Sequence, residues 1–167
     1  DVEFLKFMWP MRHFLITCGN IDSKANIITL SFCMPVSKEP PLIAISVGKK
    51  AYSRKLIEEY NGFIVNVPTD KLKKQVYFCG YNSGKNIDKF EKTNLTPQKS
   101  KQLQAPIIGE CLAFMECKII NTVDTGDKKT FIGKVIEAYA DDNSYKKIKT
   151  NLSLGDFPDK VYGNRFN

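Results

Sequence analysis

Basic side chains gather around one serine in residues 48–55, GKKAYSRK. Residues 53–60 have helical spacing, which predicts a helix that begins at Ser53 as its N-cap. A helix start offers unpaired N–H groups and a partial positive charge, and full charges are added here by Lys49, Lys50, Arg54 and Lys55. This combination favours phosphate binding. A solvated basic face with a plain N-cap accounts for the same residues, and the segment alone leaves both interpretations open.

A second segment, residues 26–41, NIITLSFCMPVSKEPP, has the pattern of a strand that ends in a loop marked by prolines. The chain then resumes as a strand at residues 42–47, LIAISV. Such a kink frees backbone N–H and C=O groups from the sheet, where they can bind a planar heterocycle. An ordinary strand and loop is the alternative. A third segment, residues 79–90, combines small residues with Lys85 and Lys89 and can close over a ligand.

Other chemistries find little support. The five cysteines are odd in number and contain no C-x-x-C pair, which argues against a disulfide framework and against a cysteine-ligated zinc site. They are expected to be reduced and mostly buried. His13 is the single histidine, so a histidine-rich metal site is excluded.

Composition places the chain among ordinary globular proteins, and we expect residues 1–167 to form one domain. The net charge of +7 indicates an anionic partner: nucleic acid, a phosphorylated cofactor or an acidic protein. The longest apolar runs are too short to span a bilayer and nothing resembles a secretory signal, so we expect a cytoplasmic protein without a membrane partner.

The elements that must position these segments are mostly strands. We expect a hairpin from residues 14–18 and 26–31, a central strand at 42–47, and a strand at 63–67. A long strand with Cys111, Ala113, Met115, Cys117 and Ile119 on one face should pair antiparallel with residues 130–140 through a turn at residues 126–127.

Two helices lie between these strands. The first should begin at Ser53, pair Lys55 with Glu59, and stop at Gly62. The second should open at residues 69–70 and stop at Gly80. Strands outnumber helices, which predicts a mainly β fold: a β-barrel with covering helices.

Taken in order, the segments resemble the flavin reductase-like family, in particular its flavoredoxin branch. The resemblance spans about residues 10–142 and includes FLITCGNIDSKANIITLS, S-x-x-P-P before LIAISV, AYSRKLI, GFIVNVP, CG-x-x-SG-x-x-x-DKF and GDKKTFIGKVIEAYADD. It implies an FMN-binding split β-barrel of antiparallel Greek-key type that forms a homodimer, with the flavin ring near the subunit boundary.

The resemblance also implies site residues. The flavin ring would lie along Asn26, Ile28, Thr29, Leu30 and Ser31, with Met34 near it. The ribityl chain would lie between Ser46 and Val47. The phosphate would be held by Lys50, Tyr52, Ser53 and Arg54, with Lys89 approaching from the DKF segment. The C-terminal segment from residue 155 is expected to form a loop near the flavin.

One departure concerns the late hairpin. Family members with nicotinamide-dependent reductase activity often have GDH there, whereas Gly126-Asp127 is followed here by Lys128. We expect Lys128 to stabilise negative charge on reduced flavin, so that Lys128→Ala changes the flavin potential and its reduction rate.

The main hypothesis is therefore a flavoprotein that passes electrons from a reductant, such as NADH or NADPH, through FMN to an acceptor. One alternative is an electron carrier or flavin-storage protein that serves protein partners and has no nicotinamide site. A weaker alternative is a small β-barrel that binds nucleic acid through its positive charge and the aromatic residues Tyr77, Phe78 and Tyr81. Its lysines are spread along the chain without a recognisable stacking motif, so no nucleic-acid partner is expected.

Overall fold

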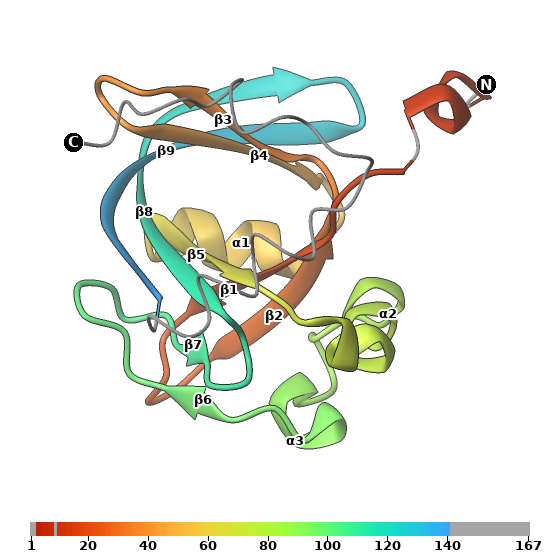
Figure 1. The fold of residues 1–167 in the computed structure, drawn as a ribbon, viewed down its shortest axis with the longest axis vertical. Coiled ribbons are helices and arrows are strands. Elements are labelled where there is room, and N and C mark those ends of the chain that lie inside the picture. The colour runs from red at the N-terminus through yellow and green to blue at the C-terminus, as the bar shows by residue number, and fades with distance from the viewer. Residues whose placement is uncertain (1–2, 9, 141–167) are drawn as a thin grey trace, which may run out of the picture.

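Seven strands form one antiparallel sheet that curls on itself in the computed structural model, which describes residues 3–8 and 10–140 (Figure 1). The predicted C-terminal loop lies outside these residues. The strands are β1 (Phe14–Gly19), β2 (Ala25–Leu30), β3 (Cys33–Ser37), β4 (Leu42–Gly48), β5 (Gly62–Val67), β8 (Ala113–Thr125) and β9 (Lys128–Ala140). A separate two-stranded sheet joins β6 (Pro97–Gln98) to β7 (Ile107–Ile108). The helices are η1 (Glu3–Met8), α1 (Tyr52–Glu59), η2 (Asp70–Leu72), α2 (Lys73–Tyr81) and α3 (Lys89–Thr93).

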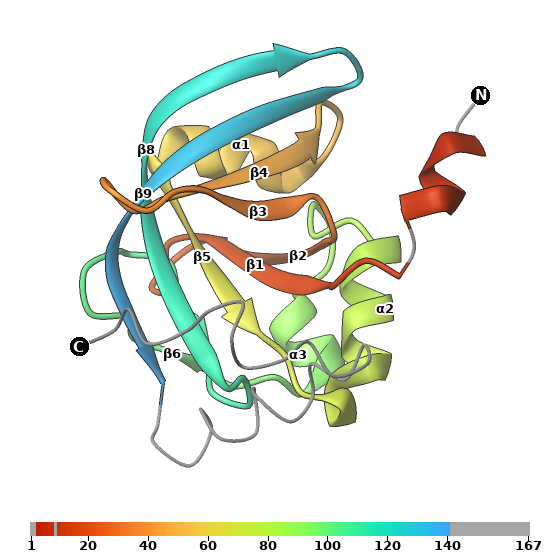
Figure 2. The same ribbon diagram turned by 45° about the horizontal axis from the view of Figure 1, so that its top comes forward.

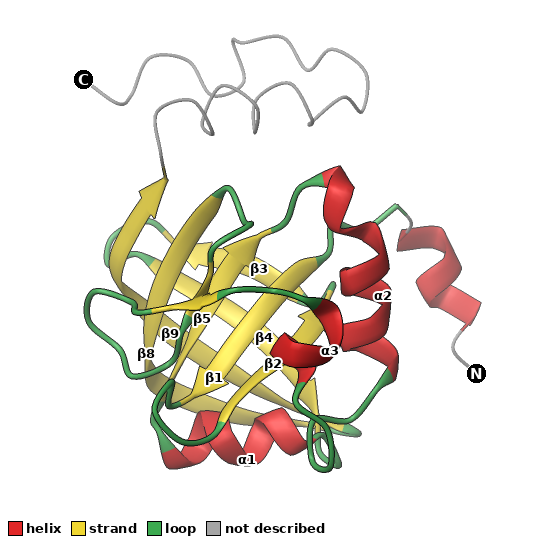
Figure 3. Cartoon of the chain, turned by 90° about the horizontal axis from the view of Figure 1, so that it is seen from below, coloured by secondary structure: helices red, strands yellow, loops and turns green. Residues whose placement is uncertain are grey.

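The strand order β2-β1-β5-β8-β9-β4-β3 leaves β2 and β3 at the two edges of the sheet. Curling brings Cα atoms of β4 within 8 Å of β2, although no ladder joins these two strands. Helix α1 covers one end of the barrel, and α2 and α3 lie beside β2 (Figure 3). The fold is thus the mainly β split barrel with covering helices that the sequence predicts. The unpaired edge of β2 is the place where the barrel is open.

The long β8–β9 hairpin forms as predicted, with Gly126 at φ 77° in its turn. Figure 2 shows both strands extending past the rest of the sheet. The predicted alternation of β8 is incomplete, because the opposite face is also covered: Phe114 and Glu116 are 9% and 0% exposed. Phe114 packs against the segment that contains β7, which adds a second core outside the barrel. A strand covered on both faces loses the simple two-residue burial pattern.

Several predicted helix boundaries are wrong. The N-cap of α1 is Ala51, and Ser53 lies inside the helix. After the helix, Asn61 rather than Gly62 adopts the left-handed conformation, with φ 50°, and Gly62 starts β5. The ion pair along α1 joins Arg54 to Glu58 instead of Lys55 to Glu59.

The second helix does not stop at Gly80 but continues to Tyr81. A Cβ atom at Gly80 would lie 3.4 Å from the Cβ of Thr29, so glycine lets α2 pack closely on β2. Helix α3 was not expected from the sequence. Its N-cap Asp88 accepts a hydrogen bond from the Glu91 N–H at 3.1 Å. Among the described residues, no helix is long and apolar enough to cross a membrane.

The five cysteines are free, and all but Cys33 are buried. Burial raises the pKa of Cys18 and of Cys33 to about 12 and that of Cys79 to about 11, and it also raises the pKa values of Cys111 and Cys117. Their thiols therefore stay protonated at neutral and mildly alkaline pH.

Alkylation should be slow as a result, because the thiolate is the reactive form. We expect less than one thiol per chain to react with iodoacetamide within an hour at pH 8, and all five to react after unfolding in guanidinium chloride. Mass spectrometry of both samples measures this. Rapid modification of two or more cysteines in the native protein would contradict the prediction.

Candidate functional site

The start of α1 is fastened to β2 by buried polar contacts. The Asn26 side-chain amide donates a hydrogen bond to the Ser53 hydroxyl at 2.8 Å, and both residues are almost fully buried. The Cys18 thiol donates weakly to the backbone carbonyls of Asn26 and Ser53, each at 3.8 Å. Because the Ser53 oxygen accepts from Asn26, its own O–H can act as a donor, and the Cys18 sulfur lies beside it as one partner. The structure therefore brings together two predicted site residues from different elements.

The helix start itself has no side-chain cap. Ala51 occupies the N-cap position and its methyl group accepts no hydrogen bond. The first N–H groups of a helix have no partner within the helix. The first turn of α1, with Tyr52 and Ser53 as its first two residues, therefore directs donors and a partial positive charge toward one place. These groups suit an anion.

The Arg54 side chain has different partners from that of Ser53. Its guanidinium donates to the Lys49 carbonyl at 2.8 Å and pairs with Glu58 at 2.5 Å. Glu58 also pairs with Lys129 of β9 at 2.5 Å. These contacts fasten α1 to the β8–β9 hairpin.

Lys49 is likewise paired, with Asp124 of β8 at 2.7 Å. Lys50 is exposed, and no ion pair of Lys50 is found within the described ranges. Much of the positive charge that the sequence places around the helix start is thus balanced by carboxylates, and Lys50 is the predicted phosphate residue whose charge is left for a ligand.

The predicted ring residues do not share one surface, because successive side chains of a strand point to opposite faces. Ile28 and Leu30 pack toward the barrel core. Thr29 points the other way and donates from its hydroxyl to the Val76 carbonyl of α2 at 2.6 Å. Asn26 points toward the start of α1. Ser31 comes directly after the end of β2 and is partly exposed. A flavin ring can therefore meet one face or the free edge of β2, but not all five side chains.

The predicted residues on the other strands are also spread out. Val47 is fully buried in the barrel core, so its side chain is not available to a ligand. Ser46 shares a hydrogen bond of 2.5 Å with Thr130 of β9, a partner that the sequence does not indicate. Met34 is exposed on β3. The ammonium of Lys128 lies 5.3 Å from the ring centroid of Phe32 and 3.4 Å from Asp127.

Lys89 differs most from its expected setting. It is 4% exposed, and its ammonium donates to the carbonyls of Ile27 at 2.7 Å and Cys79 at 2.8 Å. Nearby, Gly84 touches Asn26: a Cβ atom at Gly84 would lie 1.9 Å from the Asn26 amide oxygen. The segment between α2 and α3 thus lies against β2, and Lys89 points into the protein. Closure of this segment over a ligand stays a prediction.

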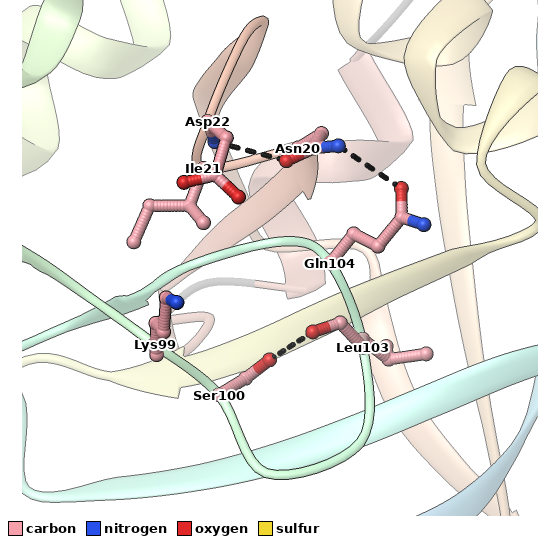
Figure 4. Close-up of a pocket in the computed structure, with 7 residues that line it drawn as sticks. All are labelled: Asn20, Ile21, Asp22, Lys99, Ser100, Leu103 and Gln104. Carbon is pink, nitrogen blue, oxygen red and sulfur yellow. Dashed lines mark hydrogen bonds between the residues drawn. The ribbon is translucent and has the colours of Figure 1, made fainter.

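A separate hollow of about 250 Å³ lies between the β1–β2 turn and the loop before β7 (Figure 4). The Asn20 amide donates to the Gln104 side chain at 3.2 Å across it, and the Ile21 N–H donates to the Gln104 carbonyl at 2.9 Å. It shares no residue with the predicted cofactor site; its lining consists of Asn20, Ile21, Asp22, Lys99, Ser100, Leu103 and Gln104.

Comparison with known proteins gives one consistent result. Residues 9–162 match the model of the flavin reductase like domain. An uncharacterised protein of Archaeoglobus fulgidus is 33% identical over 165 residues, which cover 99% of this chain and 92% of that protein. Among solved structures, the flavoredoxin of Desulfovibrio vulgaris (Miyazaki F) superposes with a TM-score of 0.75 at 29% identity, covering 81% of this chain and 72% of that one. An NADH:FAD oxidoreductase of Streptomyces globisporus superposes with a TM-score of 0.74 at 26% identity, covering 83% of this chain and 82% of that one.

Proposed function

Because the chain belongs to the flavin reductase-like family, we propose that it binds FMN where β2 meets the start of α1 and passes electrons from a reductant through the flavin to an acceptor. The observation that supports this most directly is the buried Asn26–Ser53 hydrogen bond beside the uncapped start of α1. It leaves a hydroxyl donor and helix N–H groups side by side, as a phosphate requires.

A bound flavin supplies the redox chemistry, accepting a hydride or single electrons. The residues of the chain would bind and orient it. Ser53 would donate its O–H to the phosphate, with the helix N–H groups beside it, and Lys50 would add charge. The free edge of β2 offers backbone groups to the ring, while α2 keeps water from the opposite side of the strand. No side chain has to act as an acid or a nucleophile.

Spectroscopy of the reconstituted protein tests this proposal. After incubation with FMN and removal of free flavin, the protein should be yellow and absorb as a flavin does. Addition of NADH or NADPH under nitrogen should bleach the bound flavin, and titration with FMN, FAD and riboflavin would show which flavin fits. A protein that stays colourless after reconstitution with each flavin would refute the proposal.

A second candidate, an electron carrier without a nicotinamide site, is favoured by two observations. Lys128 stands at the hairpin position where reductases of the family often have histidine. The outer face of α2 also presents the stacked, exposed rings of Tyr77 and Tyr81, with centroids 6.2 Å apart. Exposed lysines lie close to this pair in the chain, and such a basic surface suits an acidic redox protein: Lys71, Lys73, Lys74 and Lys85. Bound FMN that neither NADH nor NADPH bleaches, but that reduced ferredoxin does, would support the carrier.

A homodimer is part of the proposal. Apolar side chains are exposed on β3, on the far half of the β8–β9 hairpin and at the register shift of β9 opposite Glu116 and Cys117, and a monomer would leave them in water: Met34, Val36, Ile120, Val123 and Ile136. The near half of β8, up to residue 119, is largely buried, so it offers a partner little surface.

We therefore expect multi-angle light scattering of the FMN-loaded protein at 10 μM to give twice the chain mass of 19.0 kDa. Replacing Ile120 and Val123 together by aspartate should shift the protein toward the monomer, because both carboxylates would be buried at the contact. Replacing exposed Lys118 by aspartate is the matched control. A wild-type mass of one chain at this concentration would contradict the prediction.

A further inference from the structure

Lys89 joins two elements that flank the proposed flavin site. Its ammonium donates to the carbonyl of Ile27 on β2 and to that of Cys79 in the last turn of α2. The last carbonyls of a helix have no partner within the helix, and a cation near them is favourable. β2 is an edge strand, so its free side offers carbonyls that no neighbouring strand takes.

Two further contacts hold the same strand. The Thr29 hydroxyl donates to the Val76 carbonyl of α2 at 2.6 Å. Gly84, in the segment that leads to Lys89, lies against the Asn26 amide oxygen. Asn26 in turn donates to the Ser53 hydroxyl. A continuous set of contacts therefore runs from Lys89 and its segment, through β2, to the start of α1.

We propose that Lys89 is a positioning residue, which holds β2 against α2 so that the strand edge and Asn26 are correctly placed for the flavin, and that it does not contact the phosphate. This inference rests on the proposed function. With 4% of its surface exposed, Lys89 could reach a phosphate only by leaving two buried carbonyls without a donor. Lys89 should therefore affect the binding of the whole flavin, including its ring, and not of the phosphate alone.

Comparison of FMN with riboflavin separates the two roles. In Lys89→Met, which keeps the apolar stem and removes the ammonium, both flavins should bind about tenfold more weakly, so that their affinity ratio stays as in the wild type. A direct phosphate ligand would instead lower FMN affinity alone. Lys92→Met, on the exposed side of the same short helix α3, is the matched control and should leave both affinities unchanged.

A second readout distinguishes positioning from simple loss of stability. The visible circular dichroism of the flavin-saturated Lys89→Met protein, recorded at least 20 °C below its melting temperature, should differ from that of the wild type, because the ring then sits on a displaced strand. A lower melting temperature with unchanged spectrum and affinities would overturn the inference, and so would a loss confined to FMN.

If Lys89→Met does not fold, Gly84→Ala decides, because its added methyl group would displace Asn26 while keeping the buried ammonium. Gly84→Ala should weaken riboflavin as well as FMN, and an unchanged riboflavin affinity would overturn the inference. A wild-type protein that binds no flavin would instead contradict the proposed function, so the two failures are distinguishable.

Discussion

Glutamine in place of Glu116 is expected to lower the free energy of unfolding by about 3 kcal/mol. Glu116 is fully buried on β8, and its carboxylate accepts the backbone N–H groups of residues 101–103 at 2.8, 2.9 and 2.9 Å. It also accepts the hydroxyl of Tyr139 at 3.0 Å, and burial together with this bond raises the pKa of Tyr139. A glutamine has one acceptor oxygen instead of two, and its amide hydrogens would face donors. At least one partly buried backbone N–H of this loop would then lose its acceptor.

Urea unfolding followed by circular dichroism measures the change. Glu137→Gln is the matched control, since Glu137 lies opposite Glu116 on β9 but is partly exposed and pairs with Lys101 at 3.2 Å. Removal of such a surface pair should cost about 1 kcal/mol or less. Equal effects of the two substitutions would show that the loop of residues 101–103 does not depend on the buried carboxylate.

The burial of Glu116 could not be predicted from the sequence. The strands, the turn at Gly126 and the two longer helices could be predicted because their signals are local: alternation, helical spacing and turn residues. A charged residue within a strand is normally expected to face water. Glu116 is buried because a loop more than ten residues earlier in the chain folds over it, and nothing in the residues around position 116 indicates this.

The same reasoning explains the candidate site. The sequence identifies Ser53 and its basic neighbours, because they are close together in the chain. It does not show that Glu58 and Asp124 balance the charges of Arg54 and Lys49, since Asp124 comes from a distant strand. Gly80 looks like a helix stop by local rules, yet its small size serves packing against Thr29. Contacts between distant elements decide which predicted residues remain available for a ligand.

Alanine in place of Ser53 is expected to weaken FMN binding by about ten- to a hundredfold, the equivalent of one hydrogen bond to a charged group. The phosphate of FMN has close to two negative charges at neutral pH. In the structure, the Ser53 hydroxyl is oriented by Asn26 and stands beside the uncapped first turn of α1. Riboflavin has no phosphate, so its affinity should change by less than about threefold. Flavin fluorescence titration measures both constants.

Ser53→Ala also leaves the buried Asn26 amide without its acceptor, so stability has to be separated from binding. We expect the free energy of unfolding to fall by about 1–3 kcal/mol. The titrations should therefore be made well below the melting temperature. Equal weakening of FMN and riboflavin would show that Ser53 supports the strand rather than the phosphate.

Arg54→Ala completes the comparison, because Arg54 is the other predicted phosphate residue on α1. Its guanidinium already donates to Glu58 and to the Lys49 carbonyl, so a phosphate would have to compete with a carboxylate for it. We therefore expect Arg54→Ala to weaken FMN less than Ser53→Ala does. Lys55→Ala, one position further along the exposed side of the helix, is the control for loss of a positive charge and should have no measurable effect beyond a weak dependence on salt. A larger FMN-specific loss in Arg54→Ala than in Ser53→Ala would mean that the guanidinium leaves Glu58 when FMN binds, and that charge rather than the oriented hydroxyl holds the phosphate.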